Sequence, residues 1–269
     1  MKAMPAIVIL LLFTPYLLIA QKVNTTSVPV GANTPAPASY AELYPNMSAK
    51  SIMTPTGFGS SGTYVFGFVG GTFPQPYRSK PDFVAAAGFG AGNSYKTISV
   101  TGILNINDVS KFDNYSASFI IARHLGKGSS ISAGGLHLLA DKNKTDGIPS
   151  YFLVFSHAAQ NLPSFTPGYS KLSYSFGIGS GRFFDKSPKD ISEGKGKKGT
   201  AVFANLSYEL FKNFNVNAEW TGLNLGIGIG WRPKFKLPAI AIGLADLTGN
   251  SGNKPRFVVG IGHAFVLSQ

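Results

Sequence analysis

Four histidines are the residues of this chain whose side chains could support acid–base catalysis or metal binding near neutral pH. They are His124, His137, His157 and His263. No two of them have the spacing of metal ligands, and the chain has no cysteine to act as a ligand or nucleophile. Ser156 precedes His157, but adjacent residues of a strand point to opposite faces and cannot form a hydrogen-bonded dyad. We therefore predict no catalytic residue, no metal site and no cofactor, and we do not expect an enzyme.

Glycine-rich runs and a lysine-rich loop are the features that could bind phosphate groups. The runs "GFGAG", "GIGSG" and "GIGIG" lack the helix that follows a nucleotide-binding glycine loop, so they indicate structure. The segment 184–199, "FDKSPKDISEGKGKKG", is basic. It has two interpretations, a solvated mobile loop or a contact with surface polysaccharide or lipid phosphates.

Polar residues at strand spacing could line a path for solutes. In "YELFKNFNVNAEWTGLNLGIGIGWRP" (208–233), apolar residues alternate with Asn, Glu or Gly through successive segments. Alternate residues of a strand share a face, so one face is apolar and the other is polar or empty. We expect the polar face to point into a lumen, where it either lines a path whose side chains select small polar solutes or forms a closed polar plug. The candidate lumen-lining residues are Asn205, Glu209, Asn215, Asn217, Glu219 and Arg232.

The same stretch predicts the pairing of three strands. A three-residue turn ends at Asn213, which tolerates the left-handed conformation, and a tighter turn has Gly222 first. The glycines are expected to leave room beside the larger polar groups of the inner face. Trp220, Trp231 and Phe214 fall on the outer face near the strand ends, where an aromatic girdle is expected. The predicted inner-face pairs are Glu209–Asn215, Ser207–Asn217, Asn205–Glu219, Glu219–Gly226, Asn217–Gly228 and Asn215–Gly230.

Alternation of this kind recurs from residue 57 to the end and predicts an all-β fold, a closed antiparallel transmembrane β-barrel of about 12 strands. No segment after the first 20 residues has 18 unbroken apolar residues, which excludes helical membrane spans. Connections at 160–170 and 222–223 depart from the expected alternation of short and long loops. The predicted strands are 62–73, 82–92, 95–107, 113–125, 129–140, 150–159, 171–182, 200–211, 214–221, 224–232, 238–247 and 256–266.

Three parts make up the expected domain organisation. Residues 1–20 have the basic start, apolar core and small final residue of a cleaved signal peptide. The alternative is an uncleaved anchor helix, which Pro5 and Pro15 disfavour. Residues 21–56 are rich in Pro, Thr and Ser and are predicted to be a flexible N-terminal arm. Residues 57–269 form the β-barrel domain.

Composition agrees with a membrane environment. Only 13% of the 269 residues are charged, while Gly (32), Phe (21) and Tyr (11) are abundant. The 24 Lys and Arg exceed the 12 Asp and Glu, giving a net charge of +12. A basic balance favours anionic lipids or solutes as partners, and export makes nucleic acid an unexpected one.

Two stretches resemble a known class of protein. "YELFKNFNVNAEW" is similar to the strand–turn–strand units of Gram-negative outer-membrane β-barrels, and "RFVVGIGHAF" resembles their closing strand. "LPAIAIGLADLTG" is similar to barrels associated with exopolysaccharide export. The resemblance implies a porin-like barrel in the cell outer membrane, in contact with outer-membrane lipid.

Three functions follow as hypotheses. The first is a channel or transport pathway for small polar solutes. The second is a non-conducting barrel with a structural or polysaccharide-export accessory role, which would contact surface polysaccharide. The third is a soluble exported β-sandwich or adhesin. The sequence leaves the oligomeric state open.

Overall fold

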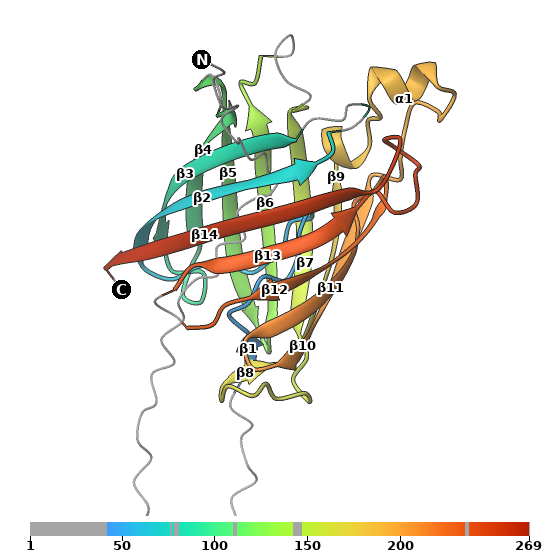
Figure 1. Cartoon of the computed structure of the whole chain (residues 1–269). Coiled ribbons are helices and arrows are strands. Elements are labelled where there is room, and N and C mark those ends of the chain that lie inside the picture. Colours follow the sequence, from blue (N-terminus) through green and yellow to red (C-terminus); the bar gives the residue numbers. More distant parts are fainter. Residues whose placement is uncertain are drawn as a thin grey trace, which may run out of the picture.

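A computed structural model describes residues 42–75, 77, 81–109, 112–141, 147–234 and 237–268. Within these residues, twelve strands form one closed antiparallel barrel, as the alternation predicts (Figure 1). The predicted signal peptide, 1–20, and residues 21–41 of the predicted arm lie outside the described residues. The strands are β2 (Thr63–Phe73), β3 (Asp82–Gly92), β4 (Ser99–Asp108), β5 (Asp113–Gly126), β6 (Ser129–Leu138), β7 (Ser150–Ala158), β9 (Leu172–Gly179), β10 (Val202–Phe211), β11 (Phe214–Trp220), β12 (Leu225–Trp231), β13 (Ala239–Ala245) and β14 (Arg256–Ser268).

The barrel closes by pairing its first and last strands. β14 is antiparallel to β2 over their whole length, from Phe257 opposite Phe73 to Ser268 opposite Thr63. This confirms "RFVVGIGHAF" as part of the closing strand. Closure removes the unpaired edges that a sheet would otherwise expose. The β-sandwich hypothesis is wrong, because a sandwich consists of two separate sheets and these twelve strands form a single closed one.

The predicted register of β10, β11 and β12 is confirmed at every predicted pair. Asn213 has φ +60° in the first turn and Gly222 has φ +92° in the second. Both residues therefore adopt the left-handed region that their turns require. The turn chemistry and the period-two pattern are local properties, which is why the sequence defines this part of the wall.

Two strands differ from their predicted bounds by three residues or more at one end, for local reasons. β4 begins at Ser99, whereas 95 was expected, because Asn93 accepts the N–H of Thr97 at 2.8 Å and turns the chain. β9 ends at Gly179, whereas 182 was expected, because the 3-10 helix η1 (Gly181–Phe183) follows it.

The two ends of the barrel differ in their connections. We call the end where β2 begins and β14 ends the terminal end, and the opposite end the loop end. The loop end carries the long connection 180–201 with the short helix α1 (Pro188–Ser192) (Figure 1). At the terminal end, the unexpectedly long connection 159–171 contains β8 (Tyr169–Ser170), which pairs in parallel with β1 (Tyr44–Pro45). Its length is thus explained by a contact with the N-terminal segment.

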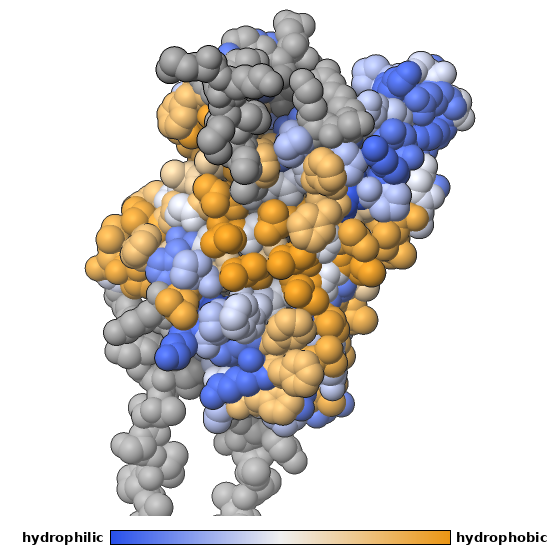
Figure 2. All heavy atoms as spheres, in the orientation of Figure 1, coloured by the Kyte–Doolittle hydropathy of each residue, from blue (hydrophilic) through white to orange (hydrophobic). Residues whose placement is uncertain are grey.

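The outer surface of the wall is apolar. On β9 the outward residues Tyr174, Phe176 and Ile178 are exposed, while Ser173 and Ser175 between them are buried. Figure 2 shows apolar residues spread over the barrel wall and polar residues gathered around α1. No helix in the described part of the chain is long and apolar enough to cross a membrane.

The core lies inside the barrel, in three apolar clusters. One contains Phe183 and Phe203, whose rings stack with centroids 4.4 Å apart. A second, on β2 to β4, contains Tyr64 and Phe66. The third surrounds Ile52, a residue that belongs to no strand. The interior is therefore filled by side chains from the wall and by a segment that precedes it.

Candidate functional site

The six predicted lumen-lining residues all have buried side chains on the inside of the wall. Five of them lie on the neighbouring strands β10 and β11, where the structure brings Asn205 opposite Glu219 and Glu209 opposite Asn215. Arg232 follows β12, and its backbone N–H donates to the carbonyl of Asn213 at 3.0 Å. The residues thus form one inner surface along the barrel.

Residues 42–60, which we call the luminal segment, occupy the space in front of that surface. Every residue from 48 to 57 is buried. The sequence predicted a flexible arm up to residue 56, but the described part, 42–56, is packed inside the barrel. The reason is that wall side chains supply partners for its polar groups, so it needs no regular secondary structure of its own.

Glu219 makes the densest contact with the luminal segment. Its Oε2 accepts the backbone N–H groups of Ile52 and Thr54, both at 3.2 Å, and the Thr54 hydroxyl at 3.0 Å. The Ser51 hydroxyl donates to the same oxygen. Asn205 Nδ2 donates to the Thr54 hydroxyl at 3.0 Å. A buried carboxylate requires such donors, and here most of them come from one turn of the segment.

Two asparagines of β11 hold the segment closer to the terminal end. Asn215 and Asn46 exchange hydrogen bonds between their side-chain amides, at 2.9 and 3.0 Å. Asn217 Nδ2 donates to the carbonyl of Ala49 at 3.1 Å. Asn215 and Asn217 therefore bind the luminal segment, at positions where the sequence predicted the lining of a solute path.

Glu209 has a different role from the other predicted lining residues. It accepts the backbone N–H of Asn213 at 2.9 Å and that of Phe165 at 3.2 Å. Both donors belong to connections at the terminal end. Glu209 therefore braces that end of the barrel.

The glycines of β12 and β13 face the luminal segment. A Cβ added at Gly228 or Gly243 would lie 1.7 or 2.0 Å from Ile52 Cδ1, and one at Gly230 would lie 2.2 Å from the carbonyl oxygen of Ala49. The sequence predicted room for polar groups of the neighbouring strand. At Gly228 and Gly230 the room is instead taken by the segment, which only glycine lets approach so closely.

A polar cluster fixes the start of the segment at the terminal end. Glu42 pairs with His124 Nε2 at 2.7 Å and accepts the N–H of Gly128, while His124 Nδ1 lies 3.0 Å from Ser130 Oγ. The ring of Tyr95 packs 4.8 Å from that of His124. A serine, a histidine and a carboxylate in series form the hydrogen-bond pattern of a hydrolase triad. Ser130 is only 2% exposed, however, so the pattern ties the segment to the wall without presenting a nucleophile.

Two of the remaining histidines bind nearby serines. His157 Nδ1 lies 2.9 Å from Ser129 Oγ, and His137 Nδ1 lies 3.3 Å from Ser116 Oγ. Ser156, adjacent to His157, points inward and donates to Ser175 Oγ at 2.6 Å. Among the described residues, no three His, Asp or Glu side chains gather as a metal site.

The predicted girdle residues lie on the outer face at the two ends of the β11–β12 hairpin. Phe214 is paired with Trp231 at the terminal end, where Trp231 is exposed. Trp220 lies at the loop end, and its indole N–H donates to Thr200 Oγ1 at 3.0 Å. Their role as an aromatic girdle at the membrane surfaces stays a prediction.

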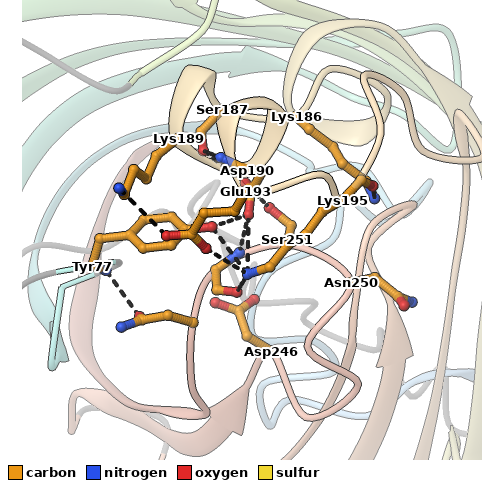
Figure 3. A network of polar contacts seen from close by, with 12 residues as sticks. Tyr77, Lys186, Ser187, Lys189, Asp190, Glu193, Lys195, Asp246, Asn250 and Ser251 are labelled. Carbon is orange, nitrogen blue, oxygen red and sulfur yellow. Dashed lines mark hydrogen bonds and ion pairs between the residues drawn. The ribbon is translucent and has the colours of Figure 1, made fainter.

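Asp190 of α1 holds the connections of the loop end together (Figure 3). This 1% exposed residue accepts Ser187 Oγ and Ser251 Oγ, each at 2.7 Å, the N–H of Gly252 at 2.8 Å, and the Tyr77 hydroxyl. Burial alone raises the pKa of Asp190, but hydrogen bonds from these four groups outweigh it and hold the pKa below its usual value. We call this cluster the loop latch.

The lysines of the basic segment 184–199 pair mostly within the loop end. Lys195 Nζ lies 3.6 Å from Asp190, and Lys189 Nζ lies 3.5 Å from Glu193. Lys198 pairs with Asp185. Much of the positive charge that one of the two interpretations would use for a polysaccharide or phosphate contact is thus offset locally.

The luminal segment and the loop latch are the features that the sequence analysis missed. The segment has no periodicity, and its Pro, Ser and Thr content is that of a linker. One signal was available: the glycines at 226, 228, 230 and 243 leave more inner space than the neighbouring strands can fill. Such an excess indicates that another part of the chain packs against the wall.

No family model matches the sequence, and no curated protein matches it. Two solved structures are similar to the chain. A KdgM porin has 10% sequence identity and a TM-score of 0.44, and a KdgM porin in complex with disordered oligogalacturonate has 10% identity and a TM-score of 0.43. Each comparison covers 76% of this chain and 99% of the other. The predicted resemblance to porin-like barrels is confirmed at the level of fold, through the closed twelve-strand barrel of the described residues.

Proposed function

We propose that this protein is an outer-membrane β-barrel that provides a passive pathway for small polar solutes through its lumen. The observation that carries the proposal is the sorting of side chains by a closed wall, with apolar residues outside and a polar strip on the inner face of β10 and β11. A passive pathway needs no catalytic step.

The exterior supports a membrane location. Outward residues of adjacent strands, such as Leu153 on β7, Phe176 on β9 and Leu206 on β10, are all exposed. Exposed apolar residues that recur on neighbouring strands mark a surface that is covered by lipid or by another protein. Lipid is the solvent in which such a surface is stable, and a closed barrel leaves no unpaired backbone in it.

The interior supports a pathway for polar solutes. Asn205, Asn215, Asn217 and Glu219 give one side of the lumen a strip of hydrogen-bonding groups on β10 and β11. In an open lumen these groups would be hydrated and could exchange hydrogen bonds with passing solutes. In this structure the luminal segment supplies hydrogen-bond partners to these groups, so they need another source of hydrogen bonds, such as water or a solute, whenever the segment is absent.

A second candidate is a non-conducting barrel with a structural or polysaccharide-export accessory role. It is favoured by the apolar clusters that fill the lumen, above all the stacked Phe183 and Phe203 and the group around Ile52. In this case the barrel would serve as an anchor, and its loop end would contact surface polysaccharide.

Solute efflux from liposomes separates the two candidates. The mature chain is reconstituted into liposomes loaded with a labelled neutral monosaccharide and a labelled large dextran. Efflux accumulates over time, so solute that leaves during rare openings of the lumen is also detected. We expect the monosaccharide to leave faster than from protein-free liposomes while the dextran is retained. Retention of both solutes would favour the non-conducting barrel, and loss of both would indicate damaged membranes.

A further inference from the structure

We propose that the luminal segment, residues 42–60, is a built-in gate that closes the lumen and withdraws toward the terminal end. Glu219 holds this gate closed. The inference rests on the proposed pathway function, because a gate requires a pathway. It assigns to this chain a closed state and a defined direction of opening.

The path of the segment permits withdrawal. Its first residues are fixed at the terminal end, where Glu42 contacts Gly128 in the β5–β6 turn. Its last residues are fixed at the same end, where the carbonyl of Ser60 accepts the N–H of Ser94 at 2.7 Å. Between them the chain reaches toward the loop end, where the carbonyl of Met53 accepts from Arg182 at 3.3 Å. The segment is therefore a loop with both legs at one end, and it can leave without being threaded through the barrel.

The polar groups of the segment favour reversible docking. Glu219 accepts four hydrogen bonds from residues 51, 52 and 54, so one carboxylate fixes the turn nearest the tip. Lys50, although buried, donates to the carbonyl of Ser48 at 3.0 Å and to that of Asn46. Because these partners belong to the segment, the Lys50 ammonium can keep them when the segment moves.

The closed state also leaves buried acceptors unsatisfied. Glu219 Oε1 and Asn217 Oδ1 are buried and have no hydrogen-bond partner among the described residues. Both face the segment side of the wall and would be hydrated if the segment left. Unsatisfied buried acceptors destabilise the closed state relative to an open, water-filled one. The cost of these two acceptors offsets part of the stabilisation that Ile52 packing gives the closed state. The free-energy difference between the closed and the open state is therefore smaller.

The loop latch makes the terminal end the exit. Asp190 ties the connections 180–201 and 246–255 to Tyr77 across the loop end. The luminal segment, by contrast, joins the terminal end through contacts of its own two legs, which are the β1–β8 pairing, Glu42 and Ser60. Withdrawal toward the terminal end leaves the contacts of Asp190 intact, whereas exit at the loop end would have to break them.

The first test measures movement without relying on conduction. Ala49→Cys places a unique thiol in a buried part of the segment, because the chain has no cysteine. Its reaction with a water-soluble maleimide is followed in detergent micelles and in liposomes. We expect Glu219→Gln to accelerate labelling about tenfold or more, since it weakens several charge-assisted hydrogen bonds. Asn105→Ser, which alters a lumen residue that donates to Ser116 and Ser118 of the wall, is the control and should leave the rate unchanged.

A second variant keeps the test valid if Glu219→Gln folds poorly. Ser51→Ala removes one donor to the carboxylate from the segment side and leaves the wall intact. It should also accelerate labelling, though less than Glu219→Gln. Folding of each variant is checked by the difference in gel migration between unheated and heated samples.

The second test locks the gate. Thr54→Cys and Asn205→Cys replace side chains that are in contact at 3.0 Å. A short bifunctional reagent that forms a disulfide with each thiol joins the two cysteines, and a reducing agent releases the link. We expect monosaccharide efflux to stop in the linked protein, to return on reduction, and to be faster in Glu219→Gln than in the wild type.

The outcomes separate the gate from the pathway. Equal efflux from the linked and the reduced protein would overturn the gate and leave the pathway standing. Faster labelling in Glu219→Gln without efflux in any variant would overturn the pathway, and the gate with it. If neither Glu219→Gln nor Ser51→Ala accelerated labelling, Glu219 would not be the residue that holds the gate closed.

Discussion

At the scale of single residues, Ile52 shows how the segment and the wall fit each other. Its side chain is 1% exposed and lies over two positions, Gly228 and Gly243, where any Cβ would collide with it. It packs with Val258 and Val84 of the wall. One isoleucine thus supplies much of the apolar packing that holds the segment in the lumen.

Replacing Ile52 by Ala should loosen the segment selectively. Truncation of a buried isoleucine costs about 2–5 kcal/mol, and here the loss falls on docking of the segment. We expect faster hydrogen exchange at the Thr54 amide, which donates to Glu219, with little change in the strands. Ile103→Ala is the matched control, since Ile103 is buried in a wall cluster. Equal acceleration of the Thr54 amide by both variants would mean that the segment is an inseparable part of the core.

At the scale of elements, the loop latch joins α1 to connections that are distant in the sequence. Asp190 accepts from Tyr77, 113 residues earlier, and from Gly252, 62 residues later. The helix is short, but Ser187 caps it by accepting the N–H of Asp190 at 3.1 Å. The Asp190 carboxylate takes part in both the helix cap and the loop latch. We therefore expect α1 and the connection 246–255 to become less ordered when this carboxylate is removed.

The latch should resist acid until the Asp190 carboxylate itself is protonated. The folded-state pKa lies below the unfolded-state value of about 3.9, so the latch contributes stability above that value and loses it as pH falls through the lower folded-state pKa. At neutral pH, Asp190→Asn should accelerate exchange of the Gly252 amide roughly 10- to 100-fold, by weakening hydrogen bonds worth about 1.5–3 kcal/mol. Wild-type protection, corrected for intrinsic exchange rates, should persist to about pH 4.

Asp185→Asn provides the control for the latch. Asp185 belongs to the same connection but pairs with Lys198 at a more exposed position, where an ion pair contributes little. This variant should leave the Gly252 amide protected. If both substitutions acted alike, the effect would reflect lost charge in the loop and not the latch.

At the scale of the whole molecule, the central issue is which solvent surrounds the barrel. Two isoleucines have similar exposed fractions, 45% for Ile227 on β12 and 40% for Ile191 on α1. If the wall is surrounded by lipid, the Ile227 side chain faces hydrocarbon and the Ile191 side chain faces water, although the protein leaves both similarly exposed. A substitution made at both positions therefore tests whether the wall is in a membrane.

Ile227→Arg should destabilise the barrel in lipid by about 2–4 kcal/mol, because a charge near mid-strand would face hydrocarbon. Ile191→Arg should change stability by less than about 0.5 kcal/mol, because the loop end is hydrated. Denaturant titrations in lipid vesicles, with the folded fraction taken from gel migration, give both values. Equal tolerance of the two substitutions would contradict a membrane-embedded wall.

Much of the wall could be predicted from the sequence, because its signals are local. Period-two alternation located all twelve strands, and turn residues such as Asn213 and Gly222 set the register of β10 to β12. The inward direction of Asn217 and Glu219 follows from that register. The contacts of these residues could not be predicted, since their partners Ala49 and Thr54 lie more than 160 residues away.

The sequence by itself determined a closed apolar-walled barrel with a polar inner strip, because alternation and turn chemistry act between near neighbours in the chain. Only the tertiary structure decided what occupies the lumen. The luminal segment has no repeating pattern, and its backbone hydrogen bonds go to side chains such as Glu219 and Ser156 that folding brings to it. A segment stabilised by such distant partners carries no local signal of its position, which is why its composition predicted a linker and the folded chain placed it inside the barrel.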